Sequence, residues 1–124
     1  MDSLVIEKTK KTPYINFDFK SGKFLIEGRC MPENTFEFFE NINLSLQEYL
    51  KSPNNTVVDI QLEYFNSSAL KYILKFLEDL SQIKINKSLE VNWFYEKDDE
   101  DIFEVGQDYQ DILGIRFNLI ELQS

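Results

Sequence analysis

Histidine is missing from all 124 residues, and cysteine occurs only once, at Cys30. Histidine is the commonest general base and a frequent metal ligand, so its absence removes many catalytic and metal-binding designs. The chain also lacks a phosphate-binding glycine loop, a dinucleotide fingerprint, a serine-hydrolase elbow and a Cys-x-x-Cys pair. We therefore expect no enzyme, no cofactor and no metal site. A lone cysteine forms no intrachain disulfide, which favours the reducing cytoplasm.

Long apolar runs are missing as well. No stretch of about 18 uncharged apolar residues could cross a membrane, and the start of the chain meets Asp2 at once instead of a long apolar segment. We expect neither a membrane span nor a secretory signal. Acidic residues, by contrast, are abundant: 22 of them accompany 13 basic ones, for a formal net charge of -9. Because this charge repels nucleic acids and anionic membranes, we expect neither as a partner.

The order of the predicted elements indicates the fold class. With 43% hydrophobic residues, the chain suits one folded domain over residues 1–124, which we expect to be a monomer. Residue spacings predict strands at 4–6, 14–19, 24–28, 56–64, 89–95 and 115–122, and helices that begin after 32–35, 66–68 and 96–101. The order β-β-β-α-β-α-β-α-β predicts a mixed α/β sheet, parallel where strands and helices alternate. Polar Asp59, Gln61 and Glu63 mark a wetter face, so about three helices should pack mainly on the other one.

The same spacings predict which apolar side chains face the core. In the first helix these are Phe36, Phe39, Ile42, Leu46, Tyr49 and Leu50, and in the central strand Val58, Ile60, Leu62 and Tyr64. In the second helix they are Leu70, Ile73, Leu74, Leu77 and Leu80, and in the third Ile102, Val105, Tyr109 and Ile112.

Two adjacent hydroxyls, Ser67 and Ser68, lie where the central strand gives way to the second helix. Asn66, Ser67 and Ser68 are all competent to cap that helix, and capping accounts for one of them. A phosphate at this point would meet free N–H groups and the positive end of the helix dipole, so it would change a surface without unfolding the domain. Local sequence leaves both roles open. A Ser-Lys nucleophile using Lys71 is a third, weaker reading.

The acidic run from Asp98 to Asp101 precedes the third helix. Carboxylates can bind a divalent cation, but the run lacks the spacing of an EF-hand loop. Negative charge also stabilises the start of a helix, and we favour that role. The run could still form a rim for a basic partner.

Several segments together resemble the SiaC family of bacterial regulatory phosphoproteins, which are small STAS-like domains, over nearly the whole chain. These segments are Thr12-Pro13, Phe17-Asp18, Gly22 to Gly28, Pro32-Glu33-Asn34, residues 64–71 (Tyr-Phe-Asn-Ser-Ser-Ala-Leu-Lys), Trp93-Phe94-Tyr95 and the acidic stretch after them.

The resemblance implies a regulatory switch without catalysis of its own. In that family a dedicated Ser/Thr protein kinase phosphorylates one hydroxyl and a PP2C-type phosphatase releases the phosphate. The unphosphorylated form binds a GGDEF diguanylate cyclase and promotes synthesis of cyclic-di-GMP, which drives aggregation and biofilm formation. Carried over by position, the acceptor is Ser67, with Ser68 as its rival, because Ser67-Ser68-Ala69 replaces the family's usual threonine and two serines.

The resemblance also implies the surroundings of that acceptor. Tyr64, Asn66, Ser68 and Lys71 would surround the phosphate, and the partner-facing rim would include Pro32, Glu33, Asn34, Asp98 and Asp99.

Two other functions stay open from the sequence. STAS-like domains also act as anti-sigma factor antagonists, whose partner would be a sigma-regulating kinase. A small-ligand-binding domain or a hydrolase using a pocket near Ser67 is the remaining alternative.

Overall fold

The computed structural model describes residues 2–123, and its elements follow the predicted order. They are β1 (Leu4–Ile6), β2 (Tyr14–Asp18), β3 (Lys23–Cys30), α1 (Thr35–Leu50), β4 (Thr56–Phe65), α2 (Ser67–Leu80), a 3-10 helix η1 (Ser81–Ile85), β5 (Leu89–Tyr95), α3 (Glu100–Leu113) and β6 (Phe117–Glu121). The predicted mixed α/β class is therefore confirmed. Gly114 ends α3 in the left-handed conformation, with φ of 66°, as its position after the last apolar residue predicts.

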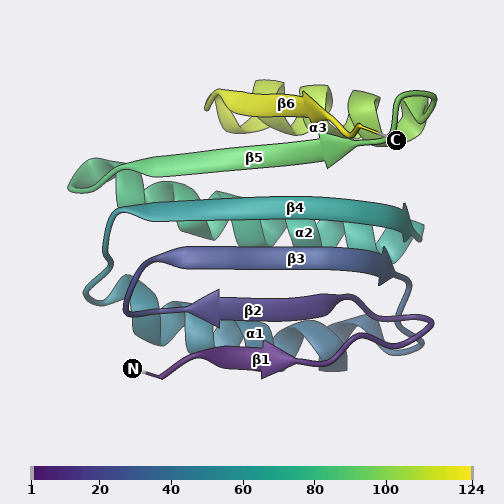
Figure 1. The fold of residues 1–124 in the computed structure, drawn as a ribbon. Coiled ribbons are helices and arrows are strands. Elements are labelled where there is room, and N and C mark those ends of the chain that lie inside the picture. Colours follow the sequence, from purple (N-terminus) through teal and green to yellow (C-terminus); the bar gives the residue numbers. More distant parts are fainter. Residues whose placement is uncertain (1, 124) are drawn as a thin grey trace.

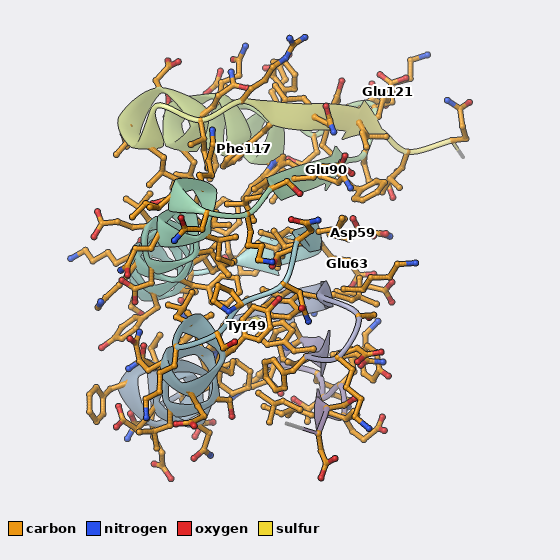
Figure 2. The ribbon with its side chains drawn as sticks, turned by 90° about the vertical axis from the view of Figure 1, so that its left-hand side faces the viewer. Tyr49, Asp59, Glu63, Glu90, Phe117 and Glu121 are labelled. Carbon is orange, nitrogen blue, oxygen red and sulfur yellow. The ribbon has the colours of Figure 1, made fainter. Side chains whose placement is uncertain are left out.

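The sheet has its strands in chain order, from β1 at one side to β6 at the other. The first three strands pair antiparallel, and β3 to β6 pair parallel. Each parallel pair is joined through a helix, and right-handed crossovers that progress in one direction place every helix on the same face of the sheet. Figure 1 shows α1, α2 and α3 behind the six strands. The carboxylates of Asp59, Glu63 and Glu90 lie on the helix-free face (Figure 2).

The core between the sheet and the helices is rich in aromatic rings. Phe17 stacks on Phe24 at 4.5 Å between ring centroids and on Phe76 of α2 at 5.4 Å. Trp93 of β5 is fully buried, and its indole N–H donates to the carbonyl of Ile102 in α3 at 2.8 Å. This hydrogen bond fixes α3 to the sheet and satisfies the only polar atom of the indole.

Three side chains that the spacing turned inward are exposed instead. Tyr64 is 53% exposed because the pairing of β3 with β4 shifts by one residue after Gly28, so that Tyr64 lies opposite Arg29 on the other face. Phe36 and Ile112 are 62% and 63% exposed. Both lie in the terminal turns of α1 and α3, where the apolar stripe continues beyond the core.

Candidate functional site

The three helices begin along one edge of the sheet, where β3, β4 and β5 end (Figure 1). Each helix starts with the same capping arrangement, in which a side-chain oxygen accepts the backbone N–H three residues on, at 2.9 to 3.0 Å. The capping residues are Asn34 for α1, Asn66 for α2 and Asp99 for α3. Asn66 therefore caps α2, and neither serine after it is needed for that purpose.

Ser67 and Ser68 are the first two residues of α2, and both are exposed. Their hydroxyls differ in hydrogen bonding. The Ser68 hydroxyl donates to Asn66 Oδ1 at 3.2 Å and lies 2.7 Å from Thr35 Oγ1 of α1. The Ser67 hydroxyl bonds to no protein group among residues 2–123. Among the described residues, the two hydroxyls thus differ: Ser68 is hydrogen-bonded and Ser67 is not.

The start of α2 carries no compensating negative charge. The first turn of α1 contains Glu37, and that of α3 contains Glu100 and Asp101, whereas that of α2 contains no acidic residue. No carboxylate in this first turn offsets the positive end of the α2 dipole. Lys71 is exposed one turn after Ser67, on the same side of the helix. Negative charge at Ser67 would be stabilised here.

Of the predicted rim, only part offers side chains to a partner. Pro32 is buried, while Asn34 and Asp99 accept hydrogen bonds as caps. Glu33 is exposed and pairs with Lys11 at 2.7 Å. The hydrogen bond and positive charge of Lys11 hold the pKa of Glu33 below its usual value. Asp98 is exposed at the same edge.

Thr35 is a site residue that the sequence analysis missed. The pair Thr35 and Ser68 is 33 residues apart in the chain, and no local pattern links them. Parallel neighbours β3 and β4 end side by side, so the segments that follow them must also be neighbours. The predicted pairing of these two strands could therefore have indicated that Thr35 and Ser68 lie close together.

A family model described as SiaC family regulatory phosphoprotein matches residues 6–122. The chain belongs to the SiaC family. This confirms the resemblance and makes the chain a regulatory protein, not an enzyme. A protein of Pseudomonas aeruginosa strain UCBPP-PA14, described as uncharacterized, is 25% identical over 119 residues, covering 94% of each chain.

Solved structures of SiaC from Pseudomonas aeruginosa have the same fold. The apo-SiaC crystal structure is 24% identical, covers 97% of this chain and 99% of its own, and gives a TM-score of 0.85. SiaC in the crystal structure of the diguanylate cyclase SiaD with its activator SiaC is 25% identical, with coverages of 96% and 99% and a TM-score of 0.82.

The lone thiol and the carboxylates of this SiaC-family chain offer no second candidate site among residues 2–123. Burial raises the pKa of the Cys30 thiol to about 12, so it is not a reactive nucleophile. Among residues 2–123, no three His, Cys, Asp or Glu side chains are grouped so that they could hold a metal ion. No helix within this range combines the length and apolar character needed to span a bilayer.

Proposed function

We propose that this SiaC-family protein is a cytoplasmic, monomeric phosphoswitch. Its unphosphorylated form binds and activates a GGDEF diguanylate cyclase, and a phosphate on Ser67 ends that binding. A protein kinase and a PP2C-type phosphatase set the state of Ser67. The observation that carries the proposal is a free, exposed hydroxyl at a helix start that lacks negative charge.

Kinship supports the choice of partner. The family is one of regulatory phosphoproteins. In Pseudomonas aeruginosa, the diguanylate cyclase SiaD has been crystallised in complex with its activator SiaC. A cyclase is therefore a better-supported partner for this chain than a sigma-regulating kinase or a small ligand.

The start of α2 supports a phosphate that leaves the fold intact. A phosphoserine adds about 1.5 to 2 negative charges at pH 7. At Ser67 this charge would lie beside unused N–H groups and within reach of the Lys71 ammonium, which favours it. A docked partner would have to strip water from the phosphate or bring carboxylates near it, and either opposes binding.

Hydrogen bonding favours Ser67 over Ser68 as the acceptor. A kinase must detach the acceptor hydroxyl from its neighbours before transfer. The Ser68 hydroxyl has two such neighbours, Thr35 and Asn66. Each neutral hydrogen bond contributes about 0.5–1.5 kcal/mol. Losing both would slow phosphorylation of Ser68 roughly 5- to 150-fold relative to a free hydroxyl.

The test compares Ser67→Ala with Ser67→Glu in binding to the cyclase and in stimulation of cyclic-di-GMP synthesis. We expect Ser67→Ala to bind and stimulate as the unphosphorylated protein does, and Ser67→Glu to stay folded but lose both activities. Ser88→Glu is the matched control, because Ser88 is exposed just before β5, at the opposite end of the strands. Equal binding by Ser67→Ala and Ser67→Glu would contradict the proposal.

Phosphopeptide mapping of the protein from its own cells tests the acceptor directly. We expect phosphate on Ser67. Phosphate on Ser68 alone would make Ser68 the acceptor. Phosphate on neither serine would contradict the phosphoswitch proposal.

A further inference from the structure

An apolar slot runs between α1 and α2 on the helical side of the molecule. Aromatic rings from both helices line it, with Phe39 and Tyr72 stacked at 5.3 Å between centroids and Phe36 and Phe76 beside them. Its free volume is about 130 Å³, enough for one or two apolar side chains. No segment among residues 2–123 fills it.

Polar contacts hold α1 and α2 together on either side of the slot. At one end Thr35 Oγ1 and Ser68 Oγ lie 2.7 Å apart. At the other, Gln47 donates to Asp79 Oδ2 at 3.3 Å, and Lys75 pairs with the same oxygen at 3.2 Å. Thr35 and Gln47 are 12 residues apart on α1, which corresponds to roughly 18 Å, or about three helical turns. The slot therefore lies between two polar contacts that join the helices.

Phe36 marks the end of the slot nearest the proposed switch. It follows Thr35 directly, and 62% of its surface is exposed. An exposed aromatic ring at the mouth of an apolar slot is typical of a residue that anchors a partner. Because Thr35 contacts Ser68, this mouth adjoins the start of α2.

We propose that this slot seats an amphipathic helix of the cyclase, with an apolar ridge facing Phe36 and Phe39 and basic residues beside that ridge. The identity of the cyclase rests on the function proposed above. A helix that presents apolar residues at every third or fourth position can lay them into an apolar groove. Lys75 also lines the slot, but it is paired with Asp79. Glu40 lines the slot and Glu37 is exposed near its mouth, so Lys or Arg on the flanks of the ridge would be complementary to these two glutamates.

A second copy of this chain fits the slot less well than such a helix. Two copies would each bring a formal net charge of -9 and the same acidic slot rim to the contact. Like charges at an interface oppose association.

Docking in the slot explains how a phosphate on Ser67 would be sensed. Ser68 contacts Thr35, the residue before Phe36, and Ser67 precedes Ser68. A phosphate there would lie at the mouth where the partner's apolar ridge enters. The ridge cannot hydrogen-bond to the phosphate, so docking would leave a desolvated charge without a partner.

The test measures binding of the full-length protein to the cyclase that it stimulates, using Phe36→Ala. We expect about 30-fold weaker binding, the size of a central interface anchor. Ile112→Ala is the matched control, since Ile112 is 63% exposed but lies at the end of α3. It should change affinity by less than about twofold. Both side chains are exposed, so both variants should unfold at the temperature of the wild type.

A photoreactive phenylalanine analogue in place of Phe36 identifies the occupant. We expect crosslinks to apolar residues of one cyclase helix. Crosslinks between two copies of this chain, equal loss of affinity in Phe36→Ala and Ile112→Ala, or unchanged binding of Phe36→Ala would each overturn the slot proposal.

The two proposals can fail separately. If Ser67→Glu blocks binding and Phe36→Ala does not, the slot is wrong and the phosphoswitch stands. If Phe36→Ala weakens binding while Ser67→Ala and Ser67→Glu bind alike, the slot stands and the phosphoswitch is wrong. A cyclase that neither binds nor responds to the wild-type protein overturns both.

Discussion

The starts of α2 and α3 are capped alike but differ in charge. Both helices follow a parallel strand at the same edge of the sheet, and both are capped by a side-chain oxygen, from Asn66 and Asp99. In α3 the first turn also contains Glu100 and Asp101, whose charge is fixed by the sequence. In α2 the corresponding positions hold a serine pair. Negative charge at α2 would therefore have to be added, and can be removed again.

The two helices also differ in how they are attached to the sheet. The Trp93 indole bonds to Ile102 of α3, and Gly106 of α3 packs directly against the same ring. The start of α2 is attached through the Asn66 backbone N–H, which donates to the Cys30 carbonyl at 3.2 Å. Both helices pack on the core, α2 through Phe76 among others, but the exposed serine pair in the first turn of α2 lies outside that packing. A switch is well placed there, because a change at the surface does not disturb the core.

The largest effect should come from disrupting the packing of α3. A Cβ at Gly106 would lie 2.6 Å from Trp93 Cδ1 and 2.7 Å from its Nε1. We expect Gly106→Ala to lower the free energy of unfolding by about 3 kcal/mol, because the rigid ring and its hydrogen bond must both shift. Urea denaturation measures this loss.

Gly114→Ala is the control, at the residue that caps the C-terminal end of the same helix. Its Cβ would meet nothing within 4 Å, and only its positive φ opposes the substitution, at a cost of about 1 kcal/mol. Equal losses for the two variants would show that contact with Trp93 does not fix α3.

Removing the caps compares the two helix starts directly. Asn66→Ala should cost about 1–2 kcal/mol, because the Asn66 side chain accepts from both the Ala69 N–H and the Ser68 hydroxyl. Asp99→Ala should cost about 1 kcal/mol, because the Asp99 side chain accepts only the Ile102 N–H among the described residues. Thermal unfolding of both variants gives the order. A greater loss in Asp99→Ala would mean that the Ser68 hydroxyl contributes nothing to the α2 cap.

Exchanging the charges should produce smaller effects of opposite sign. Ser67→Glu adds a carboxylate to the first turn of α2 and should raise the free energy of unfolding by about 0.3–1 kcal/mol. Glu100→Gln removes one from α3 and should lower it by a similar amount. At 1 M salt, where the Debye length is about 3 Å, both effects should largely disappear. A destabilised Ser67→Glu protein would argue against a phosphate being tolerated there.

The smallest expected effect is on the rate at which iodoacetamide labels Cys30, which reports local opening around that thiol. Burial raises its thiol pKa to about 12, so at pH 8 very little of the buried thiol is present as the reactive thiolate. Iodoacetamide should therefore label the native protein slowly. Asn66→Ala should speed labelling more than Asp99→Ala, because it removes the side-chain cap of α2 at the residue whose backbone N–H contacts the Cys30 carbonyl. Equal rates in both variants would show that opening at the start of α2 does not expose the thiol.

Local patterns in the sequence were enough for the fold class but not for every side chain. Alternation of strand and helix spacings predicted the element order and the helices on one face. The bulge that exposes Tyr64 arises from pairing between β3 and β4, and a period of two within one strand cannot show it. Phe36 keeps the helical spacing, yet whether it is covered depends on where α2 lies.

Local sequence likewise predicts part of the candidate site, and the rest depends on contacts between distant segments. The sequence located the serine pair at the start of a helix, because turn and cap residues there follow a strand pattern. It left open which residue caps α2, and the structure assigns that role to Asn66. It also could not distinguish a bound hydroxyl at Ser68 from a free one at Ser67, because the difference depends on Thr35 from another helix. Ser67 as the phosphate acceptor remains a prediction.

The sequential strand order has a consequence for how the protein is made. Every strand after β1 pairs with the strand that precedes it in the chain, so no strand has to insert between two that are already paired. During synthesis each new strand can join the growing edge of the sheet, with its helix closing over the strands already in place. The connections to be closed are two short loops without a helix and three helical crossovers between neighbouring strands, which keeps their entropy cost low. The domain can therefore assemble from its N-terminal hairpin onward while the ribosome is still translating the rest.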